Sequence, residues 1–154
     1  MVDRLATALL PRVAPGQFFA PQERRVLVAA AQTLLEGSNL ELAPERVARN
    51  IEEFLLAGRS RRAWRIRVLC LVIELAPMLL LGRRRFSRLG PAQRRRLVAE
   101  RFIGGRGVWA LCAKIRHLVY LGAYGDERAA PAVGFVPWPE RPRYRDRRGK
   151  LTHG

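Results

Sequence analysis

The sequence predicts an all-α protein, a single compact bundle of about six helices followed by a Pro/Arg-rich C-terminal tail. Three observations support this class: proline-led helix starts, apolar side chains at helical spacing, and no alternating Val, Ile and Thr runs that would require strands. A chain of 154 residues can bury one ordinary core, and 49% hydrophobic residues exceed what a disordered chain contains.

Three helices are predicted to begin with proline at their first position, followed by an acidic or amide side chain in the first turn. The prolines are Pro21, Pro44 and Pro91. Gly37 and Gly58 stand where the first two of these helices would end, because glycine tolerates the left-handed conformation that closes a last turn.

The first two of these helices carry apolar stripes at the i, i+4, i+7, i+8 spacing, so each is expected to bury one face. The stripes are Val26, Ala30, Thr33 and Leu34 in the first helix, and Val47, Ile51, Phe54 and Leu55 in the second.

The segment 68–76 is apolar on every side except at Glu74, so we expect other helices to enclose it and the helix to end or kink near Pro77. A membrane span needs about 20 apolar residues. The run 68–81 is shorter and is interrupted by Glu74 and Pro77, which favours a buried core helix over contact with a membrane.

The second half is predicted to hold a helix in which Val98 pairs with Phe102, then a break, then one long helix. Gly104 to Gly107 is interpreted as a tight turn between helices, because it matches neither the dinucleotide nor the P-loop fingerprint. The buried stripe expected on the long helix is Val108, Leu111, Ile115, Leu118 and Val119.

The predicted boundary lies after residue 130, with a helical domain over 1–130 and an extended basic tail over 131–154. Four prolines after residue 130 disfavour a helix there, and six Arg or Lys residues make the end of the chain cationic. Phe135 and Trp138 are apolar, so we expect 131–139 to dock and the chain to be disordered after about residue 143.

The chain is strongly basic, with 29 Lys plus Arg against 13 Asp plus Glu and a formal net charge of +16. Such a charge attracts nucleic acid, anionic lipid or acidic proteins. The cations are spread over helix starts and loops, whereas the aromatic residues belong to apolar stripes, which disfavours nucleic acid. A basic helical adaptor for nucleic acid or an anionic membrane surface remains the alternative function.

The sequence offers no recognisable active site, so we assign no catalytic, cofactor-binding or metal-binding residue to this chain. Its histidines, His117 and His153, belong to no metal-ligand pattern, and no nucleophile motif occurs. Cys70 and Cys112 are expected to be reduced core residues, with a disulfide between helices as the alternative. With no recognisable export signal or span, the expected location is the cytoplasm or the inner membrane face.

The block from Phe86 to Val136 resembles the small helical subunit of flavin-dependent glucose-methanol-choline oxidoreductases. It is also similar to the third subunit of gluconate 2-dehydrogenase and to the helical N-terminal extension of long-chain alcohol oxidases. The resemblance rests on Arg83-Arg-Arg-Phe-Ser-Arg-Leu89, Gly90-Pro-Ala-Gln-Arg94, Tyr120-Leu-Gly-Ala-Tyr-Gly-Asp126 and Val133-Gly-Phe135. Gly90, Gln93 and Glu127 replace the family's usual capping hydroxyl, Glu and Pro. We also expect this chain not to carry the export signal that some relatives supply for their flavin partner.

The resemblance implies a non-catalytic subunit that binds an FAD-containing large subunit and supports its folding, flavin retention or membrane position. FAD would belong to the partner and not to this chain. The implied partner-binding anchors, each of which could equally fill the core, are Phe86, Trp109, Tyr120, Tyr124, Phe135 and Trp138.

Overall fold

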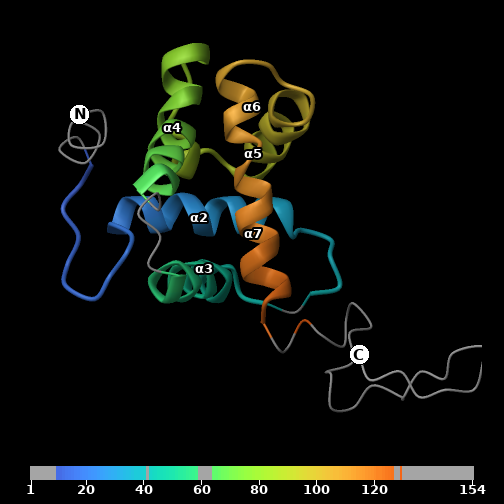
Figure 1. The fold of residues 1–154 in the computed structure, drawn as a ribbon. Coiled ribbons are helices and arrows are strands. Elements are labelled where there is room, and N and C mark those ends of the chain that lie inside the picture. The colour runs from blue at the N-terminus through green and yellow to red at the C-terminus, as the bar shows by residue number, and fades with distance from the viewer. Residues whose placement is uncertain (1–9, 41, 59–63, 127–128, 130–154) are drawn as a thin grey trace, which may run out of the picture.

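The computed structural model describes residues 10–40, 42–58, 64–126 and 129. The helices in chain order are α2 (Pro21–Leu34), α3 (Pro44–Gly58), α4 (Trp64–Leu81), η1 (Phe86–Arg88), α5 (Pro91–Leu97), η2 (Val98–Phe102), α6 (Val108–Cys112) and α7 (Ile115–Tyr124). Of the short elements, η1 is a 3₁₀ turn and η2 a π-helical turn. These residues contain no strand, so the all-α class is confirmed (Figure 1). The tail 131–154, with Phe135 and Trp138, lies outside them.

The three proline-led helix starts are confirmed, since α2, α3 and α5 begin at Pro21, Pro44 and Pro91. In α2 the backbone N–H of Ala20 donates to the carboxylate of Glu23 at 2.7 Å. In α5 the side-chain oxygen of Gln93 accepts a hydrogen bond of 3.3 Å from the backbone N–H of Gly90, the residue before Pro91. The acidic or amide side chain in the first turn therefore binds a backbone donor at the helix start.

The helices form two layers that share α2 (Figure 1). α3 and α7 pack against each other and against one side of α2, and we call these three the α2–α3–α7 layer. On the other side α4 packs against α2, η1 and α6, while α5 contacts α2 and continues into η2; we call this the α4–α5–α6 layer. One core extends from α2 into both layers, and Leu27, Ile51, Ile73, Phe86 and Val119 are fully buried.

No residue of the segment 68–76 is exposed, in agreement with the expectation that it is enclosed, and α4 packs on α2, η1 and α6. The last turn of α4 differs, since Leu79 there is 70% exposed. The helix also continues through Pro77, which is buried, as far as Leu81. It ends at Gly82, which adopts a φ of +60°, and the N–H of Arg83 donates to the carbonyl of Pro77.

The predicted long second-half helix is also wrong, because the chain breaks it after Cys112 into α6 and α7. α6 packs on α4 and η2, whereas α7 packs on α2 and α3, and one straight helix could not reach both surfaces. Ile115 and Val119 are buried as expected and Leu118 is partly buried. Val108 and Leu111, on α6, are exposed.

One further difference concerns α3, where the predicted stripe includes Phe54. Phe54 is 56% exposed, whereas Glu52, which belongs to no predicted stripe, is buried. The carboxylate of Glu52 accepts hydrogen bonds from the backbone N–H groups of Phe18 and Phe19 at 2.8 and 3.1 Å. The buried face of α3 is therefore rotated from the predicted stripe toward the side of Glu52, which the loop before α2 contacts, and Phe54 is left exposed.

Candidate partner-binding surface

The outward face of α7 carries large side chains that the described helices do not cover. Tyr120 and Tyr124 are 36% and 47% exposed, with ring centroids 5.8 Å apart, and Leu121 beside them is also exposed. The spacing of four residues places both tyrosines on the same side of the helix. We call Tyr120, Leu121 and Tyr124 the tyrosine face.

Close packing against α3 determines which face of α7 points outward. Gly122 lies so near α3 that an added Cβ would be 2.6 Å from Cγ1 of Ile51 and 2.7 Å from the carbonyl oxygen of Val47. Distances under 3.0 Å exclude a side chain at this position without a shift of α3 or α7. The opposite side of α7, with the tyrosine face, is consequently turned to solvent.

Polar contacts hold the end of α7 in the same position. Asp126 is buried and accepts hydrogen bonds from Nε of Arg46 at 3.0 Å and from Nδ2 of Asn50 at 2.8 Å. Asn50 also donates to the carbonyl of Gly122 at 2.9 Å. The side-chain hydrogen bond to Asp126 raises the pKa of Arg46, so the ion pair persists at any pH at which the carboxylate is charged.

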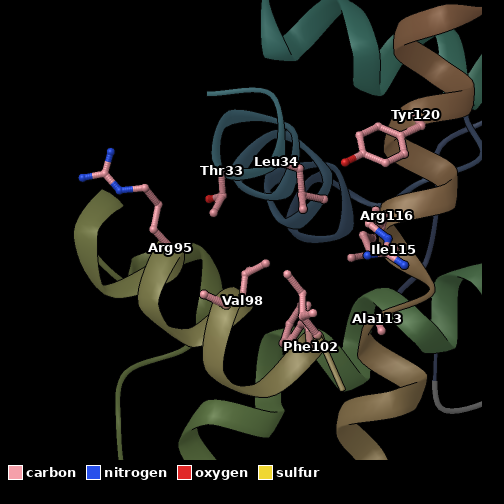
Figure 2. A pocket seen from close by; sticks show the side chains of 11 residues that line it. Thr33, Leu34, Arg95, Val98, Phe102, Ala113, Ile115, Arg116 and Tyr120 are labelled. Carbon is pink, nitrogen blue, oxygen red and sulfur yellow. The ribbon is translucent and has the colours of Figure 1, made fainter. Parts of the chain in front are cut away.

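An apolar groove of about 260 Å³ adjoins the tyrosine face (Figure 2). One wall is the end of α2 with Leu34, a second is η2 with Val98 and Phe102, and the third is the start of α7. The phenol ring of Tyr120 lies at one end, with its hydroxyl pointing toward Leu34. The lining residues are Thr33, Leu34, Arg95, Val98, Ala99, Phe102, Ile103, Ala113, Ile115, Arg116 and Tyr120.

Two arginines border this otherwise apolar groove. Arg95 forms an ion pair with Glu36, and both side chains are about half exposed. Arg116 is exposed and has no acidic partner within the described ranges. The groove thus combines apolar walls with a cation at its edge, a composition that suits an apolar side chain flanked by a carboxylate.

The structure separates the predicted anchors into different environments. Tyr120 and Tyr124 lie together on the surface, but Phe86 is fully buried and its ring stacks on Phe102 at 6.0 Å. Phe86 is therefore a core residue and not an exposed anchor. Trp109 is half-buried, with its ring 6.1 Å from that of Phe102. Phe135 and Trp138 lie outside the described residues.

The groups most often used in catalysis are dispersed or protected from solvent. Where the chain is described, no three His, Cys, Asp or Glu side chains cluster so as to hold a metal ion. Cys70 and Cys112 are buried free thiols, and burial raises the pKa of Cys112 to about 11 and that of Cys70 further. Both sulfurs are therefore protonated and weakly nucleophilic at neutral pH. His117 is exposed on α7.

The groove itself was not predicted from the sequence. Its walls include Ala99, Ile103 and Ala113, which belong to no predicted stripe, and it exists because the predicted long helix breaks at Ala113. The break has no local marker such as proline or glycine, since residues 108–121 contain neither. Only the different packing partners of α6 and α7 explain it.

Comparison of the chain with protein-family models, with curated proteins and with solved structures finds no match. None of the described helices combines the length and apolar character needed to cross a membrane.

Proposed function

We propose that this chain is a non-catalytic small subunit that binds the FAD-containing large subunit of a glucose-methanol-choline-type oxidoreductase. In this heterodimeric complex it supports the folding of the large subunit and its retention of flavin. The observation that carries the proposal is the exposed tyrosine face, continuous with an apolar groove and held in place by the packing of α7 on α3.

The chemistry of this surface favours a protein partner. Tyrosine is enriched at protein interfaces because its ring provides apolar area while its hydroxyl still forms hydrogen bonds. An aromatic pair beside a concave apolar pocket is the arrangement found where a few residues provide most of the binding energy. Since α7 is fixed on α3 by Gly122 and Asp126, little conformational entropy would be lost on binding.

The identity of the partner rests on the resemblance of residues 86–136 to the oxidoreductase small subunits. The part of that block within the described residues runs from η1 to α7 and contains the tyrosine face and every groove wall except α2. The resemblance and the exposed surface thus fall on the same part of the chain, which supports a shared binding role.

Co-expression with a large subunit of this oxidoreductase type from the same organism tests the proposal. The two chains should co-purify, and the large subunit should contain more FAD, by absorbance, than when it is expressed alone. A large subunit that is soluble, flavin-loaded and fully active alone would overturn the accessory role.

Two variants locate the interface. Tyr120→Ser with Tyr124→Ser should lower affinity for the large subunit at least tenfold, because it removes both rings of the exposed pair. Ala99→Phe should also weaken binding by filling the groove from an exposed position. Phe54→Ser removes an equally exposed aromatic ring from α3 and is the matched control, expected to bind like wild type. Equal loss in the control would show that this surface is not the interface.

A further inference from the structure

The end of the molecule at the last turn of α4 has a different character from the tyrosine face. Leu79 and Leu80 are 70% and 51% exposed there, and Met78 is also exposed. They follow the buried Ala76 and Pro77 directly, so the apolar run of α4 continues beyond the core into solvent. Exposed leucines on the final turn of a helix form an apolar patch, and the described residues do not cover it.

A second element adds apolar side chains to the same end. α6 packs on α4, and the turn that leads into α6 projects at the same end of the molecule as the tip of α4 (top of Figure 1). Val108 and Leu111 on α6 are exposed. We call this set, Met78, Leu79, Leu80, Val108 and Leu111, the apolar tip. Ile103 is also exposed, but it lines the groove beside the tyrosine face and is not included.

Arginines surround the apolar tip. Arg83, Arg84 and Arg85 follow α4 directly and are all exposed, as are Arg101 and Arg106 around the turn before α6. Residues 75–114 contain one acidic side chain, Glu100, and it forms an ion pair with Arg96. Glu74, on α4 itself, accepts hydrogen bonds from the backbone N–H and hydroxyl of Ser87. Glu100 also interacts electrostatically with Arg83, and Glu23 and Glu74 line the same pocket as Arg85. The arginines still outnumber these acidic groups, so this end of the molecule has a net positive charge.

A lipid bilayer with anionic headgroups matches both features of this end. Its acyl region accepts leucine side chains, and its phosphates attract a cluster of arginines beside them. Arginine stems can lie along the apolar boundary while the guanidinium groups reach the phosphates. Duplex nucleic acid would satisfy the arginines but would leave Leu79 and Leu80 without apolar contact, so the combination favours lipid.

We propose that the apolar tip docks this protein on an anionic lipid surface, with Leu79 and Leu80 inserted among the acyl chains and Arg83 to Arg85 bound to headgroup phosphates. The contact is interfacial, in agreement with the absence of a membrane-crossing helix among the described residues. It is independent of the tyrosine face, which belongs to α7.

Flotation of the full-length chain with vesicles tests this proposal. The wild-type chain should bind vesicles of phosphatidylcholine mixed with phosphatidylglycerol, release them as salt rises, and bind pure phosphatidylcholine far more weakly. Leu79→Ser with Leu80→Ser should lower the affinity about tenfold for each leucine. Replacing Arg83, Arg84 and Arg85 by Gln should lower it at least tenfold and make the salt dependence shallower.

Two matched controls define the result. Leu56→Ser with Arg49→Gln alters an exposed leucine and an exposed arginine of α3 and should bind vesicles like wild type. The Tyr120→Ser, Tyr124→Ser variant should also bind vesicles normally, which separates lipid docking from large-subunit binding. Far-UV circular dichroism of each variant confirms that it is folded.

Three outcomes would overturn the proposal. The first is equal binding to neutral and anionic vesicles, and the second is a loss in the α3 control as large as the loss in the leucine variant. The third is binding to duplex DNA that depends on Arg83 to Arg85 while anionic vesicles are ignored, which would identify this end as a nucleic-acid surface.

Discussion

The two layers of the molecule use different means to hold their helices. In the α2–α3–α7 layer, buried carboxylates bind donors far away in the sequence: Glu52 binds the loop before α2, and Asp126 binds Arg46 and Asn50. In the α4–α5–α6 layer, the rings of Phe86 and Trp109 lie near that of Phe102, and the carboxylate of Glu74 binds Ser87, only 13 residues away. Among the described residues of this layer, the buried charged side chain is an arginine, Arg94.

The carboxylate contacts determine how the tyrosine face is presented. Hydrogen bonds to a carboxylate are directional, so Asp126 and its donors hold the end of α7 in one orientation on α3. The α4–α5–α6 layer contains the longest described helix, α4, but also the π-helical turn η2 and the five-residue helix α6. Its apolar side chains also continue to the surface at the apolar tip.

The largest expected effect tests whether the aromatic stack is a true core. Phe86→Ala should destabilise the protein by about 3 to 5 kcal/mol, because it removes a fully buried ring and leaves a cavity beside Phe102. Urea unfolding followed by far-UV circular dichroism measures the loss. Phe54→Ala removes an exposed ring and should cost less than about 1 kcal/mol. Equal losses would mean that the aromatic layer has no packed core of its own.

A second, smaller effect tests the close approach within the other layer. Gly122→Val should cost about 3 kcal/mol, because a side chain there collides with the backbone of α3 and not only with a flexible side chain. Gly58→Ala is the matched control, since a Cβ at that position meets no atom within 4 Å and its φ is not positive. Thermal unfolding of both variants gives the comparison, and an undiminished midpoint for Gly122→Val would show that α7 can move away from α3 without cost.

Local sequence signals predicted the elements whose causes are local. The helix starts are fixed by Pro21, Pro44 and Pro91, because the proline ring holds φ near the helical value. Proline has no backbone N–H, but the first turn of a helix does not use that donor. Spacing likewise identified Val47 and Ile51 as buried, since one face of a helix must leave water. These parts of the fold depend on no distant partner.

The errors arise where distant segments compete for one surface. Phe54 follows the apolar spacing of α3, yet the loop before α2 packs on the side of α3 that carries Glu52, the acceptor for the backbone of Phe18 and Phe19. The buried face is rotated toward that side, and Phe54 is left exposed. In the candidate site, the proximity of Tyr120 and Tyr124 follows from the sequence, because the two residues are four positions apart on one helix. The groove beside them could not be predicted, because its walls come from α2, η2 and α7, which only the tertiary fold brings together.

The smallest expected effect tests the buried carboxylate itself. Burial opposes ionisation of Glu52, but the N–H groups of Phe19 and Phe18 together with Arg24 outweigh it and lower its pKa. A lowered pKa stabilises the folded state fully above the ordinary glutamate value of about 4.3, and the contribution is lost as pH falls through the lower folded value. Glu52→Gln keeps the shape but loses the charge, and should cost about 2 kcal/mol at pH 7.

The pH dependence of that cost separates the charge of Glu52 from its shape. Unfolding free energies of wild type and Glu52→Gln, measured by urea from pH 7 to pH 3, should converge as acid protonates the wild-type carboxylate. Glu100→Gln is the control, because Glu100 also has a lowered pKa through Arg96 but lies fully exposed in the other layer. Its replacement should leave stability nearly unchanged at every pH. A difference between wild type and Glu52→Gln that stays constant with pH would mean that shape and not ionic hydrogen bonding joins the loop to α3, which removes the contrast between the two layers.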